Sequence, residues 1–275
     1  MSKIDTLSQQ FSQLFGARMH TRLMLNFDTR RKLPTLLLID DDMVSREVTA
    51  TVLTMSGYAV HTAEGGAKAL ELLAEGCTPD VILTDAQMPG LSGPRLIAEL
   101  RAHSDARIYL ISGSNPPDDV AASADGFLLK PFDASALEKL LEGHPLPGAP
   151  ARPSRIQPTD PVINLETLAQ FRGMMSEAAV REIYTAVIAD LIKRTQALEA
   201  AIAKGDDSEV RRIGHAIKGG CGMAGAIQAA RLGALFEELL ASTESNHLDN
   251  SMALLSDLRA AARNLERMLE AELPA

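Results

Sequence analysis

Acidic, hydroxyl and basic residues follow the apolar runs in the first half of the chain. The run LLLIDDD carries Asp40 and Asp41 directly after four apolar residues, VILTD ends in Asp85, YLIS ends in Ser112, and FLLK ends in Lys130. If these runs are parallel strands, their carboxyl ends meet at the edge of the sheet where ligands bind. Neighbouring carboxylates repel and raise each other's pKa, so they need a counter-charge. Clustered carboxylates suit Mg²⁺, which takes one or two of them and leaves room for a phosphoryl oxygen.

The chemistry predicted for this edge is the capture of a phosphoryl group. With Mg²⁺ and Lys130 neutralising the phosphoryl oxygens, one carboxylate can attack phosphorus and form an aspartyl phosphate. Asp85 is the expected nucleophile because it is a lone acid, whereas Asp40 and Asp41 are adjacent and better placed to hold metal. Ser112 can donate a hydrogen bond to the bound group. Taken singly, each such Asp or Ser is more often a helix cap or turn residue, but four strand ends that agree point to a site.

A histidine in the second half of the chain is the other candidate for chemistry. The segment RRIGHAIKGGCGMAGA holds His215, with Arg211 one turn before it and Lys218 one turn after it. Helical periodicity places His215 on the face opposite Ile213, away from the core. A neutral imidazole is a competent nucleophile for phosphorus near pH 7, and we expect the flanking cations to favour that neutral form. A lone exposed histidine, however, usually has no role.

Four glycines surround this histidine, at positions 214, 219, 220 and 222. Each weakens a helix interior by about 1 kcal/mol relative to alanine, so something must require small residues. We expect another protein's surface to approach the His215 ring, since a bulky side chain at 219 or 222 would obstruct it. Tight packing between helices could account for some of the glycines. A phosphate-binding loop is disfavoured, because the spacing is not that of a P-loop and no strand precedes it.

The elements that must position these residues differ between the two halves. Before residue 143, short continuous apolar runs alternate with helical patterns, which predicts strands buried on both faces of a parallel sheet with helices on each side. The predicted strands are 36–40, 59–62, 81–85, 108–112 and 127–130, and the predicted helices are 45–56, 66–75, 94–102, 117–123 and 134–142. After the linker every strong apolar period is helical, which predicts an antiparallel bundle. Asp206 and Glu209 are placed as an N-cap and its third-position partner.

Composition shifts divide the chain into four parts. Six prolines within 143–161 forbid continuous helix or sheet, so this segment is a linker between domains at 34–142 and 162–275. Residues 1–33 are an N-terminal extension that is expected to be partly helical. It is either a helix that docks or forms a homo-oligomer, or a frayed extension. A membrane-surface anchor or targeting segment is the alternative for the extension.

Bulk properties exclude several classes of protein. No apolar run approaches the ~20 residues that cross a bilayer, so we expect a cytoplasmic protein without membrane insertion. A net charge of −9 with no tryptophan argues against nucleic-acid partners. The two cysteines, Cys77 and Cys221, are far apart and are expected to be buried or idle thiols.

The first half resembles a response-regulator receiver domain. The resemblance is carried by DDD at 40–42, DAQMPGLSG at 85–93, ISGS at 111–114 and FLLKPF at 127–132. It implies a flavodoxin-like, doubly wound fold with a five-stranded parallel sheet. It also implies that Asp85 is the phosphoacceptor, that Mg²⁺ is held by Asp40 or Asp41, Asp85 and the backbone carbonyl of Gln87, and that Ser112 and Lys130 are the switch hydroxyl and the conserved-type lysine of the family.

Two departures from the receiver pattern affect the activation surface. Phe127 stands where many receivers carry tyrosine, and the stretch between Ser112 and Lys130 is several residues shorter than usual. The fourth helix of this domain is therefore expected to be short.

Residues 162–272 resemble a histidine phosphotransfer (HPt) domain, and HAIKGGCGMAGA follows that family's His, Lys, Gly pattern. The resemblance implies an up-and-down four-helix bundle with an extra helix near 164–174. It also implies that His215 is the phosphorylated residue and Lys218 its electrostatic helper.

Together the two halves look like the middle of a phosphorelay. We expect a sensor histidine kinase to phosphorylate Asp85, and the group to pass to His215 and then to another receiver. No nucleotide-binding glycine box is present, so ATP is not a predicted ligand. One alternative is a phosphorylation-controlled adaptor, with His215 as a phosphate sink. Another is a small-molecule phosphatase, although Asp85 lacks the adjacent second acid that such enzymes use.

Overall fold

The computed structural model describes residues 33–113, 116, 118–143, 161–239 and 247–273. The chain divides into two compact units, residues 1–33 and 34–275. Nearly all of the predicted N-terminal extension and Pro-rich linker lies outside the described residues. The predicted boundaries of the four parts stay predictions.

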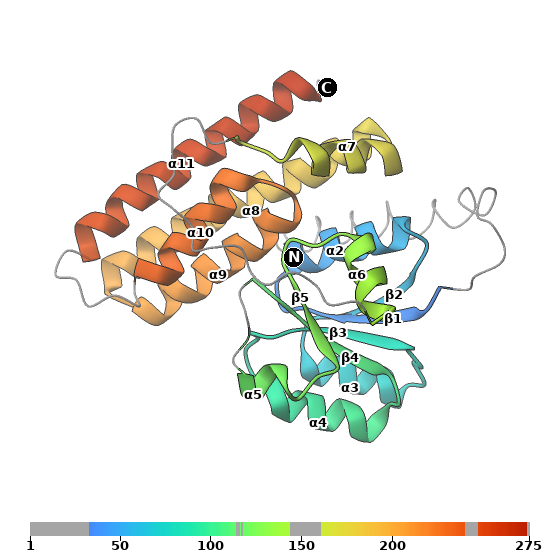
Figure 1. Cartoon of the computed structure of the whole chain (residues 1–275). Helices are drawn as coiled ribbons and strands as arrows, with labels where there is room; N and C mark the ends of the chain where they lie inside the picture. The colour runs from blue at the N-terminus through green and yellow to red at the C-terminus, as the bar shows by residue number, and fades with distance from the viewer. Residues whose placement is uncertain (1–32, 114–115, 117, 144–160, 240–246, 274–275) are drawn as a thin grey trace. The chain divides into compact units, whose positions relative to one another are not determined.

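The first half of the described chain is a five-stranded parallel sheet with strand order β2-β1-β3-β4-β5. Helices α2 and α6 cover one face of the sheet and helices α3, α4 and α5 cover the other (Figure 1). The strands are β1 (Thr35–Ile39), β2 (Ala59–Ala63), β3 (Val81–Asp85), β4 (Arg107–Ser112) and β5 (Gly126–Leu129). The helices are α2 (Met43–Met55), α3 (Gly66–Ala74), α4 (Gly93–His103), α5 (Asp118–Ala121) and α6 (Ala134–Leu141). The predicted α/β class is confirmed, with element ends shifted by a few residues at most.

Continuous burial of the central strands explains why this sheet forms. Leu36, Leu37, Leu38 and Ile39 of β1 are fully buried, and every residue of β3 is buried. A strand without a polar face needs cover on both sides, which the two helical layers supply. The α5 helix has four residues, so the expected short helix is present.

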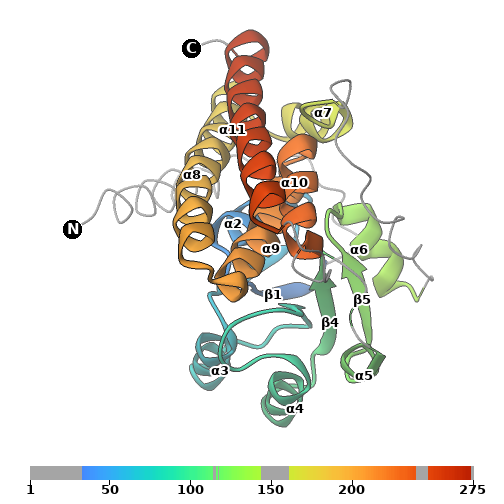
Figure 2. The same ribbon diagram turned by 90° about the vertical axis from the view of Figure 1, so that its left-hand side faces the viewer.

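The second half is a bundle of long helices. Helices α8 (Glu177–Lys204), α9 (Asp207–Met223), α10 (Ile227–Leu239) and α11 (His247–Glu272) lie side by side (Figure 2). The shorter α7 (Leu165–Met174) precedes them at the predicted position. Asp206 caps α9 by accepting a hydrogen bond from the backbone amide of Glu209 at 3.1 Å, as predicted.

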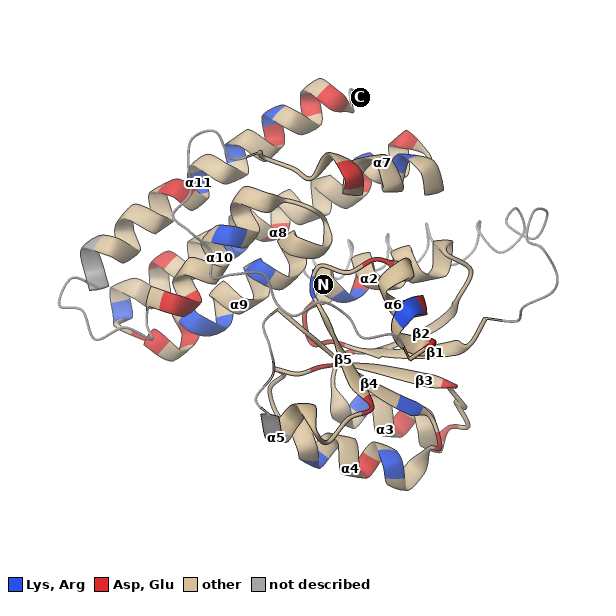
Figure 3. Cartoon of the chain, in the orientation of Figure 1, with Lys and Arg blue, Asp and Glu red and all other residues tan. Residues whose placement is uncertain are grey.

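The bundle core is built from apolar side chains. Tyr184, Phe171 and Phe236 are its largest fully buried side chains. Both basic and acidic positions occur along the bundle helices (Figure 3). Within the described part of the chain, no helix has the length and apolar character needed to cross a membrane.

Both cysteines are free thiols. Cys221 is buried inside the bundle, and burial raises the pKa of its thiol to about 12. Cys77 is half-buried, and burial raises its pKa as well. A thiol with a raised pKa carries little thiolate at neutral pH, as expected for structural cysteines.

Candidate functional site: an acidic sheet edge and a histidine helix

The carboxyl edge of the sheet brings Asp40, Asp85 and Lys130 together. Nζ of Lys130 lies 2.7 Å from Oδ2 of Asp40 and 2.6 Å from Oδ2 of Asp85. All three side chains are at least 95% buried. Buried charges are tolerated when they are paired, so the lysine provides the counter-charge that the consecutive acids require.

Two short connections place these groups. The chain leaves β1 one residue earlier than predicted, and Asp40 therefore lies just beyond the strand. The chain also leaves β5 at Leu129, where the backbone amide of Lys130 donates a hydrogen bond of 2.7 Å to the carbonyl of Ser112. This bond fixes the start of the Lys130 side chain beside the end of β4. The peptide bond between Lys130 and Pro131 is cis.

Lys130 stays charged in this environment. Burial alone would lower its pKa, but the charges of Asp85 and Asp40 more than offset that effect and raise the pKa above its ordinary value. The ammonium is therefore a fixed positive charge between two carboxylates at any physiological pH.

Asp40 also receives hydrogen bonds from neighbouring groups. Oγ of Ser45 donates to Oδ2 at 2.7 Å, and the backbone amide of Asp42 donates to Oδ1 at 2.9 Å. A guanidinium nitrogen of Arg46 donates to the backbone carbonyl of Asp40 at 2.6 Å. Both carboxylate oxygens of Asp40 are thus engaged by the protein itself.

Asp41 lies among like charges. Burial raises its pKa, and the charges of Asp40, Asp85 and Asp42 raise it further. A bound cation would relieve that repulsion, so the residues fit a hard divalent ion. The described residues contain no group of three His, Cys, Asp or Glu side chains arranged to hold a metal. Mg²⁺ does not need one, because it takes one or two carboxylates and keeps several waters.

Gln87 and Ser112 lie next to Asp85. The backbone amide of Gln87 donates to Oδ1 of Asp85 at 2.8 Å, which fixes the loop that follows β3. Ser112 is buried at the end of β4, one residue beyond Ile111, which pairs with Asp85 across the two strands. The predicted strand-end residues therefore meet at one edge of the sheet.

His215 is held by an acid that the sequence interpretation did not single out. Its Nδ1 lies 2.5 Å from Oε1 of Glu237 on α10, and Nζ of Lys218 lies 2.9 Å from Oε2 of the same carboxylate. Burial raises the pKa of Glu237, but the hydrogen bonds of His215 and Lys218 outweigh it and the pKa is lowered. An ionised carboxylate only accepts hydrogen bonds, so in the neutral form of the ring Nδ1 carries the proton and Nε2 holds the lone pair.

The predicted effect of the flanking cations on His215 was wrong. Burial lowers its pKa, but the hydrogen bond and charge of Glu237 and the charge of Asp85 more than offset burial, and the pKa is raised. Lys218 does not act on the ring alone, because its charge is neutralised by Glu237. His215 lies outside the bundle core, as predicted, yet its side chain is only 18% exposed.

The acidic edge of the sheet lies close to α9 and helps to bury His215. The charges of Asp85 and Lys130 act on His215, and a Cβ added to Gly219 would lie 4.0 Å from Nζ of Lys130. A Cβ added to Gly220 would lie 3.3 Å from Oδ1 of Asp42. The sequence predicted that another protein's surface approaches positions 219 and 222. The structure brings the receiver half of the same chain to these positions instead, since a Cβ at Gly222 would lie 3.9 Å from Cδ of Pro131. The approach of another protein stays a prediction.

Gly214 has a different reason to be small. A Cβ at this position would lie 2.9 Å from the carbonyl oxygen of Gly233 and 2.9 Å from Cβ of Phe236, both on α10. Close packing between α9 and α10 therefore requires this glycine, which was the alternative considered from the sequence.

The sequence interpretation missed three residues of this site: Glu237, Asp42 and Arg194. Glu237 directly follows Phe236 on α10. An acid beside the apolar residues of this helix is the local signal that the sequence offers. Arg194 binds Asp190 one turn earlier on α8, a spacing that is usual for a surface ion pair. It also lies 2.5 Å from Asp42, a contact across 152 residues that no local pattern predicts.

Comparison with known proteins agrees with both halves. Residues 36–142 match the response regulator receiver domain family, and residues 182–271 match the Hpt domain family. The two-component response regulator ORR6 of Oryza sativa subsp. japonica is 36% identical over 114 residues, which is 38% of this chain and 67% of that protein. The chain belongs to the two-component response regulators.

This chain is also similar to another response regulator and to a sensor kinase, over smaller fractions of their length. Response regulator MprA of Mycobacterium sp. (strain KMS) is 37% identical over 38% of this chain and 46% of its own. Sensor kinase CckA of Brucella abortus (strain 2308) is 36% identical over 39% of this chain and 12% of its own. The chain thus spans less than half of these two relatives.

Solved structures match about the same fraction of this chain as the relatives found by sequence. Vibrio cholerae chemotaxis protein CheY4 is 28% identical, with a TM-score of 0.37, over 41% of this chain and 98% of that chain. Response regulator protein TrrA from Thermotoga maritima, solved in complex with Mg(2+)-BeF, is 30% identical, with a TM-score of 0.37, over 40% of this chain and 98% of that chain.

Proposed function

We propose that this chain is a phosphorelay intermediate that accepts a phosphoryl group on Asp85 and exchanges it with His215. The observation that carries the proposal is the approach of α9 to the acidic sheet edge, where a Cβ added to Gly219, one turn after His215, would lie 4.0 Å from Nζ of Lys130. A sensor histidine kinase would supply the group, and a further receiver would take it from His215. A cytoplasmic location without nucleic-acid partners remains part of the prediction.

Capture of the group at Asp85 uses residues already aligned. Oδ1 is fixed by the amide of Gln87 and Oδ2 by Lys130, so the carboxylate is presented in one orientation. A carboxylate oxygen bonds to phosphorus while the bond from phosphorus to the donor's leaving oxygen or nitrogen breaks. Lys130 can follow the phosphoryl oxygens, and the Ser112 hydroxyl can donate to them.

Asp41, Asp85 and the backbone carbonyl of Gln87 are the groups best suited to hold Mg²⁺, with Asp40 as the alternative to Asp41. Bound there, Mg²⁺ would supply positive charge to the phosphoryl oxygens. Asp40 is the weaker candidate, because its side-chain oxygens accept from three donors, Lys130, Ser45 and the amide of Asp42, whereas those of Asp85 accept from two.

Transfer to His215 is a single displacement at phosphorus. The Nε2 lone pair of His215 forms the nitrogen–phosphorus bond, the bond from phosphorus to the Asp85 oxygen breaks, and the Asp85 carboxylate is recovered. The ring becomes positively charged in this step, while Nδ1 keeps its proton against Glu237. The carboxylate of Glu237 therefore stabilises the charge that develops on the imidazole, and the reverse reaction uses the same contacts.

The test uses wild type and the variants Asp85→Asn and His215→Gln, each incubated with acetyl phosphate and Mg²⁺. Wild type is expected to carry base-labile label on Asp85 and acid-labile label on His215. His215→Gln should keep only the first, and Asp85→Asn should keep neither. If a kinase labels His215 of the Asp85→Asn variant directly, the proposed order of transfer is wrong.

A second receiver distinguishes the relay from an adaptor or phosphate sink. Phospho-His215 of a relay protein passes its label to a separate receiver that is added to the mixture. A sink loses the label to water at the same rate whether or not that receiver is present.

A further inference from the structure

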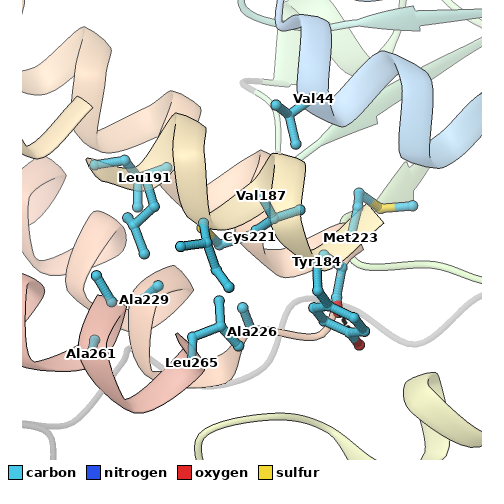
Figure 4. Close-up of a cluster of buried hydrophobic side chains, with 14 of the residues drawn as sticks. Val44, Tyr184, Val187, Leu191, Cys221, Met223, Ala226, Ala229, Ala261 and Leu265 are labelled. Carbon is cyan, nitrogen blue, oxygen red and sulfur yellow. Dashed lines mark hydrogen bonds between the residues drawn. The ribbon is translucent and has the colours of Figure 1, made fainter. Parts of the chain in front are cut away.

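The receiver half and the bundle meet through an apolar contact and a charged contact. Val44, Val48 and Val52 of α2 belong to the same buried cluster as Ile217 and Cys221 of α9. Figure 4 shows Val44 of α2 beside the bundle residues of this cluster. Apolar contacts of this kind bring two surfaces together without selecting one partner over another.

The charged contact joins Arg194 of α8 to Asp42 at the start of α2. A guanidinium nitrogen of Arg194 lies 2.5 Å from Oδ2 of Asp42, and the two side chains are 18% and 10% exposed. Asp190 binds the same guanidinium from within α8, so the Arg194 side chain is already oriented toward α2. Because both groups are mostly buried, a partner lacking an acid at this position would leave part of the guanidinium unpaired.

The space for Asp42 depends on Gly220. A Cβ at this position would lie 3.3 Å from Oδ1 of Asp42 and 3.5 Å from Cγ1 of Val44. Arg194 and Gly220, on neighbouring helices, together form a site into which one carboxylate fits. Asp85 is held by Lys130 and Gln87 and not by Asp42. Oδ1 of Asp42 caps α2 by accepting from the amide of Ser45, and its Oδ2 accepts from Arg194.

We propose that Asp42 and Arg194 are a specificity-determining pair that selects this chain's own receiver domain as the exchange partner of His215. The inference rests on the proposed function, since it names the partner of that transfer. Exchange between Asp85 and His215 then takes place within one molecule. While the pair is formed, the receiver domain covers the face of α9 that a second receiver would need.

The test is a double-mutant cycle on the full chain. Asp42→Asn keeps an oxygen for the capping bond from the amide of Ser45 but loses the charge. Arg194→Gln removes the guanidinium, and the double variant combines the two. Asp85 is loaded with acetyl phosphate and Mg²⁺, and the rate of His215 labelling is expressed per loaded Asp85. Arg259→Gln, which alters an ion pair with Glu199 on the bundle surface, is the matched control.

Each single variant is expected to slow transfer about tenfold, with the double variant no slower than either single one, because the second change has no pair left to break. Arg194→Lys, which keeps the charge, should recover part of the rate. The wild-type rate constant should not depend on protein concentration, as required for exchange within one molecule.

Three results would overturn the inference. Single variants that transfer at the wild-type rate, or effects that add in the double variant, would show that the pair does not select the partner. A rate proportional to protein concentration would show exchange between molecules. In each of these cases labelled His215 leaves the proposed relay function intact. If wild type loads Asp85 but never labels His215, the relay function fails, and the inference fails with it.

Discussion

Oε1 of Glu237 lies 2.5 Å from Nδ1 of His215, and Oε2 of the same carboxylate lies 2.9 Å from Nζ of Lys218. One acid on α10 therefore holds two side chains of α9 that are one turn apart. The contact selects the tautomer with a free Nε2, in the way that a carboxylate orients the histidine of a hydrolase triad. It also ties the charge of the ring to the charge of Glu237.

The rate of His215 labelling is expected to rise with pH through a midpoint above the ordinary histidine value of 6.5. The nucleophile is the neutral ring, and a raised pKa keeps the ring protonated until a higher pH is reached. Burial and the charge of Lys130 lower this pKa, whereas Glu237 and Asp85 raise it by more. In Glu237→Gln the acceptor oxygen remains but the charge is lost, so the midpoint should move to lower pH.

The measurement is the initial rate of His215 labelling per loaded Asp85, across roughly pH 5.5 to 8.5. Glu238→Gln removes an exposed acid from the next position on α10 and should leave the midpoint unchanged. An unchanged midpoint in Glu237→Gln would mean that Glu237 does not set the protonation of His215.

Orientation of the ring can be separated from its charge with Glu237→Ala. This variant loses both the acceptor and the charge, whereas Glu237→Gln loses only the charge. At a pH where the ring is neutral in both variants, Glu237→Ala is expected to label His215 about tenfold more slowly, because the imidazole is no longer held in one tautomer and direction. Equal rates in the two variants would argue that ring orientation contributes nothing.

Alanine substitutions at two glycines of α9 should affect different properties, the stability of the bundle at Gly214 and the transfer rate at Gly220. Gly214→Ala places a methyl group 2.9 Å from the Gly233 carbonyl, so we expect the free energy of unfolding to fall by about 1–3 kcal/mol. Gly220→Ala instead touches Asp42, and should slow transfer to His215 more than it affects the bundle. Gly173→Ala, in α7 with no atom within 4 Å of the added Cβ, is the control and should be neutral or stabilising. Urea unfolding and the labelling assay measure the two effects.

The sheet could be predicted from the sequence because its strands are buried on both faces. Leu36 to Ile39 carry no polar residue, and parallel strands of that kind bring Asp85, Ser112 and Lys130 to one edge whatever the details of the loops. Strand ends were predicted less accurately. Lys130 was predicted inside the last strand, but its amide bonds to the Ser112 carbonyl just beyond it.

The contacts between helices could not be predicted in the same way. Helical periodicity placed His215 away from the bundle core but gave no information about which residue of α10 faces it, since that depends on the packing of two helices. The charge of His215 was therefore judged from Arg211 and Lys218 on its own helix, and Glu237 was missed. Asp42 and Arg194 are separated by 152 residues, and only the packing of α2 against the bundle brings them together.

Removal of the ammonium at the sheet edge should destabilise the protein in the absence of Mg²⁺. Lys130→Met leaves Asp40 and Asp85 as buried carboxylates without a cation, and breaking such a pair costs about 3–5 kcal/mol. Added Mg²⁺ should recover part of that loss, because it returns positive charge to the same carboxylates. Urea unfolding with and without Mg²⁺ measures both effects. Lys139→Met, at an exposed position of α6, should change stability by less than about 0.5 kcal/mol.

Asp41→Asn should raise the stability of the metal-free protein and lower its affinity for Mg²⁺. Burial and the charges of Asp40, Asp85 and Asp42 raise the pKa of Asp41 above its ordinary value of 3.8, so the folded state binds its proton more tightly than the unfolded state. Its contribution to stability therefore becomes less favourable as pH rises from that value through the raised pKa.

At pH 7 without Mg²⁺, Asp41→Asn is therefore expected to melt at a higher temperature than wild type. The difference should shrink as the pH falls from the raised pKa toward 3.8, because Asp41 of the folded state becomes protonated over that range. Added Mg²⁺ should raise the melting temperature of wild type more than that of the variant, because a ligand stabilises the folded state according to its affinity. Asp257→Asn, an exposed change on α11, should show neither effect. A variant that gains as much from Mg²⁺ as wild type would move the metal-binding role from Asp41 to Asp40, and Lys130 would then have to leave Oδ2 of Asp40 when the ion binds.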